Sequence, residues 1–163
     1  MEKCIYVYIN IYTYSYSFHL PLVHHSDYFG CYQNTLPSTI GPSEEGSALF
    51  TKTPDTACGA VGVFTFELYN QSTKTVDKKM AVMFSNPYSF DFFYNLYAVG
   101  LFDKNQLCEY SLYHKMYYNA GKEFVRHRAG YPLTYEGDGL IISASMTDTY
   151  EPELDVIIRS IDG

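Results

Sequence analysis

The sequence MFSNPYSFDFFYNLYAVG, residues 83–100, is the stretch around which the rest of the chain is organised. Its middle is a proline-containing turn crowded with aromatic rings, among which Asp91 is the one charged residue. The rings belong to Tyr88, Phe90, Phe92, Phe93, Tyr94 and Tyr97. If exposed, these rings would form an apolar patch of the kind that marks a binding or membrane site. Large apolar residues are more often inside a protein, so a role in the core is the alternative.

The segment QLCEYSLYHKMYYNAG, residues 106–121, predicts an α-helix over 105–118. One expected face of this helix is made of Leu107, Tyr110, Met116 and Tyr117. Tyr113 and Tyr117 are four residues apart, which places their rings on the same side of a helix. Asn105 is the expected N-cap, and Gly121 is expected to end the helix.

Short segments in which apolar and polar residues alternate recur along the chain, and each predicts a strand. The expected strands are residues 4–16 (a long strand or a hairpin), 47–52, 59–70, 79–85, 95–102, 123–127, 140–146 and 154–161. The first has an apolar face of Ile5, Val7, Ile9 and Ile11. Many short strands separated by turn residues are typical of a sandwich or a barrel. The predicted fold class is therefore all-β-dominated, a β-sandwich with a flanking α-helix.

Length and composition narrow the function. The 163 residues are expected to form a single domain, 1–163, long enough to bury a sizeable core. A net charge of -7 argues against nucleic acid, whose binding proteins carry a basic stripe. It does not exclude a zwitterionic membrane. No run approaches the roughly 20 apolar residues of a transmembrane helix.

Catalytic and metal-binding patterns find little support, so neither an enzyme nor a cofactor is expected. The sequence has no GxSxG, HExxH or GxxxxGK[ST] motif. His24 and His25 are adjacent, and on a strand they would point to opposite faces, which makes a poor metal pair. The acidic run near the C-terminus lacks the order of a calcium loop. The cysteines, Cys4, Cys31, Cys58 and Cys108, include no CxxC pair, and free buried thiols are favoured over two disulfides.

Three runs in fixed order carry a family resemblance: TACGAVGVFTF at 56–66, MAVMFSNPYSF at 80–90 and YHKMYYN at 113–119. Together they resemble the actinoporins, pore-forming cytolysins of sea anemones, and look closer still to actinoporin-like proteins of fishes and other animals. The resemblance extends from about residue 3 to about residue 158. It implies a β-sandwich flanked by helices and a pocket for phosphocholine headgroups that favours sphingomyelin.

Carried over residue by residue, the resemblance implies a phosphocholine-binding set of Ser26, Val61, Ser85, Pro87, Phe93, Tyr113, Tyr117 and Tyr118. The physical chemistry agrees, because ring faces hold a quaternary ammonium through cation–π attraction. Tyrosine hydroxyls and Ser85 can donate hydrogen bonds to the phosphate. Phe93 takes the place of a pocket tyrosine and would lose one hydroxyl, worth about 1 kcal/mol at most.

The resemblance also implies a membrane-interface set of Tyr88, Phe90, Phe92, Tyr94, Leu96 and Tyr97. Strongly lytic members present tryptophans in this loop, and Phe92 and Leu96 stand at the matching positions here. Insertion is expected to be weaker, because tryptophan and tyrosine are the preferred interfacial anchors.

A second departure concerns the start of the chain. The family lines its pore with an N-terminal amphipathic helix, and only Met1, Glu2 and Lys3 precede Cys4 here. A few residues at 1.5 Å each cannot cross about 30 Å of hydrocarbon. The expectation is a chain that binds sphingomyelin-containing bilayers and releases little dye from them.

Three hypotheses therefore stand. The first is an actinoporin-like protein with a lipid membrane as its partner, able to form a homo-oligomer there. The second is a lectin that stacks a glycan on its tyrosines, and the third is a structural domain whose rings are core. The resemblance implies a secreted protein or one at a target cell membrane. The first residues do not form a signal peptide, so a cytoplasmic location stays open.

Overall fold

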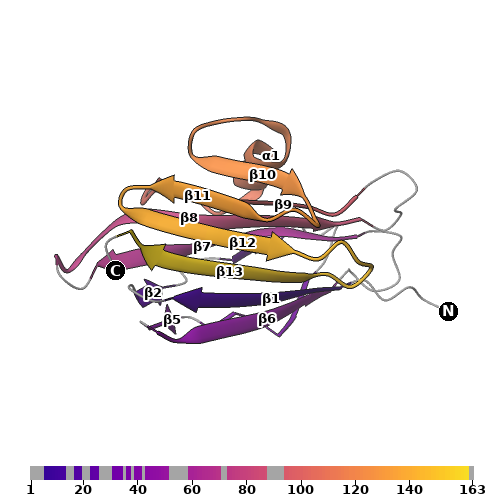
Figure 1. The fold of residues 1–163 in the computed structure, drawn as a ribbon, viewed down its shortest axis with the longest axis horizontal. Helices are drawn as coiled ribbons and strands as arrows, with labels where there is room; N and C mark the ends of the chain where they lie inside the picture. Colours follow the sequence, from indigo (N-terminus) through magenta and orange to yellow (C-terminus); the bar gives the residue numbers. More distant parts are fainter. Residues whose placement is uncertain are drawn as a thin grey trace.

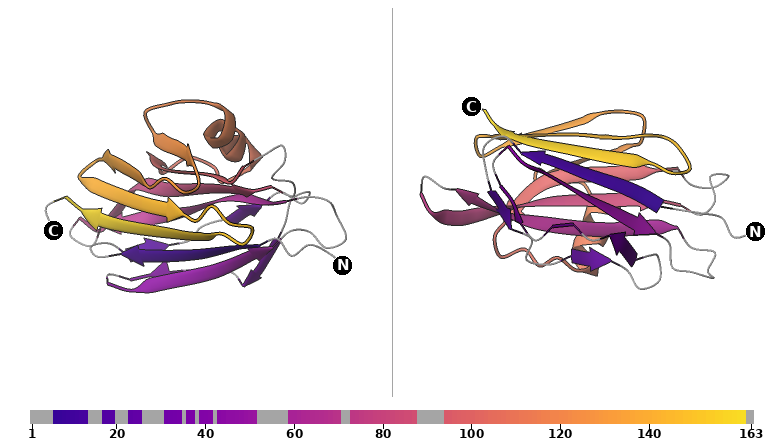
Figure 2. Two further views of the ribbon diagram at one scale, coloured as in Figure 1. Left: turned by 45° about the vertical axis from the view of Figure 1, so that its right-hand side comes forward. Right: turned by 90° about the horizontal axis from the view of Figure 1, so that it is seen from below.

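In the computed structural model, the chain forms two β-sheets stacked face to face with one helix on the outside (Figures 1 and 2). The structure describes residues 6–13, 17–19, 23–25, 31–34, 36–37, 39–41, 43–51, 59–70, 73–87 and 94–161. The β-sandwich predicted from the alternating segments is confirmed.

The first sheet has the strand order β11-β12-β13-β1-β6-β4. These strands are β11 (Leu133–Gly137), β12 (Leu140–Met146), β13 (Glu153–Ser160), β1 (Tyr6–Thr13), β6 (Glu45–Thr51) and β4 (Cys31–Asn34). The two strands near the chain ends, β1 and β13, pair in parallel at the centre. The side chains of Val7, Ile9 and Ile11 are fully buried, as the alternation in this strand predicts.

The second sheet has the order β10-β9-β8-β7-β2-β5, and β3 also pairs with β7. Its strands are β10 (Phe124–Arg128), β9 (Leu96–Asp103), β8 (Thr75–Asn86), β7 (Ala60–Asn70), β2 (Ser17–His19), β5 (Thr39–Ile40) and β3 (Val23–His25). The long strands β7 and β8 run side by side (Figure 1).

The second sheet is buried on both faces. Phe64 and Phe66 belong to the core between the two sheets, whereas Val63 belongs to a second cluster on the outer face. That outer cluster is covered by α1 (Tyr110–Tyr118), which seats Leu112 and Met116 on the sheet. Leu112 and Met116 are four residues apart, so they lie on one face of the helix. The helix is therefore held by packing, which a nine-residue segment needs in order to be stable.

The predicted helix limits and the predicted helix face are both partly wrong. The helix begins at Tyr110, after an extended Glu109. Asn105 lies in the turn after β9, where its backbone amide donates a hydrogen bond of 2.9 Å to Asp103 Oδ1. The helix ends at Tyr118, before Gly121. Leu107 and Tyr110 are exposed. Tyr110 and Met116 are six residues apart, a rotation of about 240° around the axis at 3.6 residues per turn, so they do not share a face.

The other strand predictions differ from the structure mainly in length. The segment predicted at 4–16 gives β1 alone as a continuous strand within its described residues, and β8 extends well before residue 79. The strands β2, β3, β4, β5 and β11 were absent from the prediction. The segment predicted at 140–146 forms β12 with the same limits.

Gly100 lets β10 approach β9 closely. A Cβ at this position would lie 2.1 Å from the carbonyl oxygen of Glu123, closer than atoms can approach. The Leu101 amide donates to the same oxygen at 2.9 Å. The glycine thus permits this position of β10, the strand that carries Arg126 and Arg128 and lies beside α1 (Figure 1).

Tyr97 is a core residue, so its assignment to the membrane-interface set is wrong. Its side chain is fully buried, and its hydroxyl donates to the carbonyl oxygens of Tyr131 and Ala144, which links β9 to the first sheet. Burial raises the pKa of Tyr97 to about 12. The position follows from the strand: Tyr97 alternates with Leu96 and Ala98, which face the helix.

We expect Tyr97→Phe to lower the free energy of unfolding by about 1–3 kcal/mol, because two carbonyl oxygens lose their donor. Urea denaturation followed by circular dichroism measures this change. Because the pKa of Tyr97 is raised from 10.0 to about 12, its stabilisation is complete below pH 10 and declines as the pH rises towards 12. Tyr97→Phe should therefore also weaken the alkaline loss of stability.

Tyr135→Phe is the matched control, since that hydroxyl makes one exposed bond of 3.3 Å to the carbonyl oxygen of Lys122. Its effect should stay within about 0.5 kcal/mol. Equal stability of the Tyr97→Phe variant and the unmodified chain would contradict the structural role of the Tyr97 hydroxyl.

Candidate functional site

Beside its buried face, α1 presents a connected cluster of aromatic rings, of which Tyr113 and Tyr117 also pack against the cluster under the helix. Tyr113 and Tyr117 stack with their centroids 5.7 Å apart, as the four-residue spacing predicts. Tyr117 contacts Tyr118 edge-on at 4.6 Å, and His114 lies 4.6 Å from Tyr118. Tyr110 continues the cluster at 6.1 Å from Tyr113. Because Leu112 and Met116 fix the rotation of the helix, these rings are held along its exposed side and flank.

The floor beside this ring cluster is a row of residues across three strands. Val61 pairs with Ser85, and Ser85 pairs with Leu96. Directly paired residues point to the same face of a sheet, and this face carries the helix. The row lies at the ends of the strands nearest the β8–β9 connection. Val61 and Ser85 are 8% and 6% exposed, so they form a floor rather than a rim.

Ser85 and Tyr113 join the floor to the ring cluster. The Ser85 side chain lies close enough to the Tyr113 hydroxyl to influence its pKa. Burial raises the pKa of Tyr113 well above its ordinary value, and the neighbouring tyrosines Tyr117 and Tyr118 raise it further, against the opposing effect of Ser85. Burial also raises the pKa of Tyr117. Both phenols are therefore protonated at neutral pH and can donate hydrogen bonds.

Arg126 holds the end of the helix that carries the rings. Its Nη1 donates to the carbonyl oxygen of Met116 at 2.7 Å and also to that of Asn119. The last carbonyl groups of a helix have no partner within the helix, and a cation there also interacts favourably with the helix dipole. Lys115 adds an ion pair of 3.0 Å with Glu123. Sequence reasoning missed Arg126, because it lies on the next strand and its helix contact depends on the fold.

The structure brings together Val61, Ser85, Tyr113, Tyr117 and Tyr118 from the implied phosphocholine set. Pro87 is buried directly after β8, next to this group in sequence. Ser26 and Phe93 lie outside the described residues. Tyr118 is 63% exposed and stands at the rim.

Of the membrane-interface set, Tyr94 is exposed and Leu96 is half-buried against the helix-side cluster. Tyr88, Phe90 and Phe92 lie outside the described residues, and Tyr97 is in the core as noted above.

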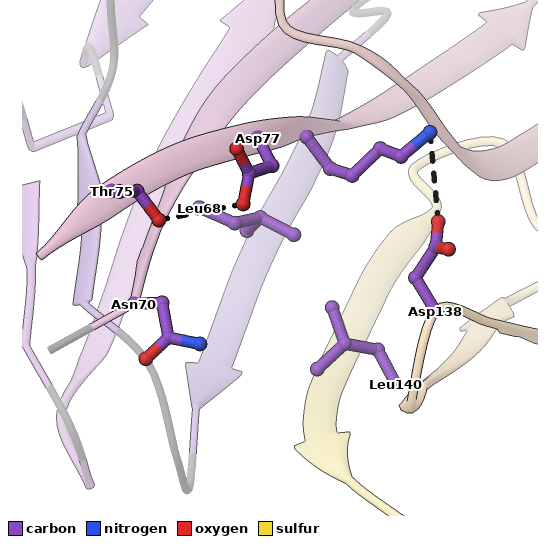
Figure 3. Close-up of a pocket in the computed structure, with 7 residues that line it drawn as sticks. Leu68, Asn70, Thr75, Asp77, Asp138 and Leu140 are labelled. Atoms are coloured by element: carbon purple, nitrogen blue, oxygen red, sulfur yellow. Dashed lines mark hydrogen bonds and ion pairs between the residues drawn. The ribbon is translucent and has the colours of Figure 1, made fainter. Parts of the chain in front are cut away.

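A separate cavity of about 200 Å³ lies at the other end of β8 (Figure 3). It is lined by Leu68, Asn70, Thr75, Asp77, Lys78, Asp138 and Leu140. Lys78 and Asp138 form an ion pair of 3.6 Å across it, between β8 and the β11–β12 turn. Lys78 and Ser85 are seven residues apart on one strand, about 23 Å at the usual rise. This cavity is therefore not part of the ring site.

The described residues give the ring site no cysteine and no metal-binding group. Cys108 is a buried thiol in the cluster under α1, as expected for that residue, and its Sγ lies 3.6 Å from the carbonyl oxygen of Val63. The part of the chain that the structure describes contains no group of three or more His, Cys, Asp or Glu placed to hold a metal ion. Among these same residues, no helix has the length and apolar character needed to cross a membrane.

The architecture is that of the actinoporin-like β-sandwich, and comparison with known proteins agrees. The family model described as sea anemone cytotoxic protein matches residues 30–160. The chain therefore belongs to this family, the actinoporins, which is a family of cytotoxic proteins rather than enzymes. A search of curated proteins finds no match.

Two solved structures share the fold at low sequence identity. One is described as the lipid binding protein Nakanori, with a TM-score of 0.71 and 10% identity over 94% of this chain and 70% of that one. The other is IP-1A from Alcaligenes faecalis, with a TM-score of 0.53 and 9% identity over 97% of this chain and 92% of that one. At these identities the likeness establishes the fold alone.

We expect Arg126→Ala to loosen the end of α1, because two helix carbonyl oxygens lose a charged donor. The loss should be about 1–2 kcal/mol, the low end for charged hydrogen bonds, since Arg126 is only half-buried. Hydrogen exchange of the amides at 113–119 should become faster, and the free energy of unfolding should fall. Arg159→Ala, an exposed arginine on β13, is the control. Unchanged exchange in the Arg126→Ala variant would refute the anchoring role.

Proposed function

We propose that this chain docks on lipid bilayers by holding phosphocholine headgroups, those of sphingomyelin above all, among the rings of α1. The observation that carries the proposal is the contact of Tyr113, Tyr117 and Tyr118 in one cluster, with Ser85 at its base. Tyrosine faces attract a quaternary ammonium, and attraction at a desolvated site reaches about 2 kcal/mol or more.

The polar groups of the cluster suit the other half of the headgroup. The hydroxyls of Tyr113 and Tyr117 are protonated at neutral pH, as ordinary phenols are, and burial raises the pKa of both groups further, so each can donate to a phosphate oxygen. A carboxylate at this position would repel the phosphate. Neutral phenols beside ring faces therefore match a zwitterionic headgroup, with the ammonium on the rings and the phosphate on the hydroxyls.

Charge and family membership support a zwitterionic membrane as the partner. The net charge of -7 would be repelled by an anionic leaflet, whereas a phosphocholine surface carries no net charge. The exposed Tyr94 lies at the same end of the sandwich and has the wet tip and apolar body of an interfacial anchor. The family is one of cytotoxic proteins, and a structure of the same fold belongs to a lipid binding protein. The protein is therefore proposed to act at the surface of a target cell that carries phosphocholine headgroups.

We expect Tyr117→Ala to weaken the binding of soluble phosphocholine by about 1–2 kcal/mol, which is about 5–30-fold in Kd. Titration calorimetry with the intact chain measures the loss. Tyr8→Ala is the control, because Tyr8 is an exposed tyrosine on β1 in the other sheet. A folded Tyr117→Ala variant that binds phosphocholine as well as the unmodified chain would remove the ring cluster from the headgroup site.

We further expect the chain to bind vesicles of phosphatidylcholine with sphingomyelin more tightly than vesicles of anionic lipid alone. Vesicle flotation measures binding, and dye release from the same vesicles measures permeabilisation separately. A glycan array run in parallel tests the lectin alternative. Glycan binding without vesicle binding would favour the lectin, and binding to neither would favour a purely structural role for the rings.

A further inference from the structure

Arg128 is a guanidinium beside the ring site for which the described part of the chain supplies no acidic partner. Its Cζ lies 4.7 Å from the centroid of the Tyr94 ring. Among the described residues, no carboxylate forms an ion pair with it, whereas Lys78 and Lys115 have one each. In a chain with 18 acidic and 11 basic residues, an exposed arginine that stacks on a ring instead of an acid is available for an external anion.

The sheet places Arg128 in the same row as the floor of the headgroup site. Arg128 pairs with Leu96, Leu96 pairs with Ser85, and Ser85 pairs with Val61. These residues therefore point to the same face, the one that α1 covers. Two strand spacings separate the backbones of Arg128 and Ser85, about 10 Å. A long arginine side chain on this row lies on the same side of the sheet as Ser85 and α1.

Tyr94 connects Arg128 to the rings on the helix. The Tyr94 side chain lies under the guanidinium and is also close enough to Tyr117 to raise the pKa of that phenol slightly. Tyr94 is thus in contact with the cation and near the ring of Tyr117. A headgroup with its ammonium on the helix rings would direct its phosphate towards this side.

Hydrogen bonds hold Tyr94 and Arg128 in this relation. Asn95, which follows Tyr94, is fully buried, and its Nδ2 donates to the carbonyl oxygen of Thr149 at 2.7 Å. The amide of Ala129, which follows Arg128, donates to the carbonyl oxygen of Asn95 at 2.9 Å. The two segments are therefore fixed to one another and to the β12–β13 connection. Such preorganisation reduces the entropy lost when a ligand binds.

The remaining charges around Arg128 do not favour a second role for it. Asp148 and Glu151 are exposed on the β12–β13 connection, and neither forms an ion pair with Arg128. Arg126, two residues earlier on the same strand, is already used by the helix carbonyl groups. His127 points to the other side of the strand and lies against Tyr131.

We propose that Arg128, presented on the ring of Tyr94, is a charged phosphate ligand of the headgroup site beside the Tyr113 and Tyr117 hydroxyls, while the faces of the helix tyrosines hold the ammonium. This inference rests on the proposed function and adds a named specificity residue to it. Arginine is suited to the role because its planar fork donates two hydrogen bonds to a phosphate.

Two soluble probes separate the two halves of the headgroup: phosphocholine, which carries both charges, and choline, which lacks the phosphate. We expect Arg128→Gln to weaken phosphocholine binding about tenfold or more, the effect of losing a charged hydrogen bond. Choline binding should change less than about twofold, because cation–π attraction to the helix rings remains. Tyr117→Ala should weaken both. Titration calorimetry with the full chain measures all of these binding affinities.

Two further variants serve as controls for this experiment. Arg128→Lys keeps the charge and loses the fork, so its phosphocholine affinity should fall between those of the unmodified chain and Arg128→Gln. Arg159→Gln, an exposed arginine on β13, should leave both affinities unchanged. Circular dichroism verifies that each variant is folded.

Two results would overturn the inference while leaving the headgroup site intact: unchanged phosphocholine affinity in Arg128→Gln, or an equal loss for choline and phosphocholine. If the unmodified chain binds neither probe, the proposed function itself fails, and the role of Arg128 fails with it. Selective loss of phosphocholine in Arg128→Gln, with choline binding retained, is the result that supports the assignment.

Discussion

The outer face of the second sheet is apolar, and the rest of the site depends on covering it. Val63, Met83 and Ala98 would face water if α1 did not seat Leu112 and Met116 on them. A nine-residue helix has little stability alone, so packing on this face both orders it and sets its rotation. Once the rotation is set, Tyr113, Tyr117 and Tyr118 lie beside the strand ends that carry Ser85. The burial of one surface thus positions the ring cluster next to it.

Interactions from the far side of the fold then make the site rigid. Arg126 donates a hydrogen bond to a carbonyl group at the end of α1. Asn95 links the start of β9 to the β12–β13 connection. Tyr97 connects the same region to the first sheet through its buried hydroxyl. Each of these three side chains donates a hydrogen bond to a backbone carbonyl oxygen of another element. Buried carbonyl groups need such donors. The surface around the rings is consequently built on a hydrogen-bonded frame, although the rings themselves lie at its edge.

The electrostatics of the site differ from those of the whole chain. The molecule is acidic overall, whereas the ring site contains protonated phenols and, at its open end, an arginine stacked on a tyrosine. This arrangement suits a ligand that carries a cation and an anion a short distance apart. Composition alone could not identify such a ligand, because the net charge of a chain does not show which residues lie close together in the fold.

The sequence by itself determined the fold class, most strands and the family, because alternation and ordered motifs are local properties of the chain. It also placed Tyr113 beside Tyr117 through helical spacing. Only the tertiary structure decided that Tyr97 is core, since strand alternation does not say which face is covered. The roles of Arg126 and Arg128 were likewise invisible in the sequence. Their partners, Met116 and Tyr94, are set by the packing of α1 and by the pairing of β9 with β10. Such long-range contacts depend on how whole elements dock, which no short stretch of residues specifies.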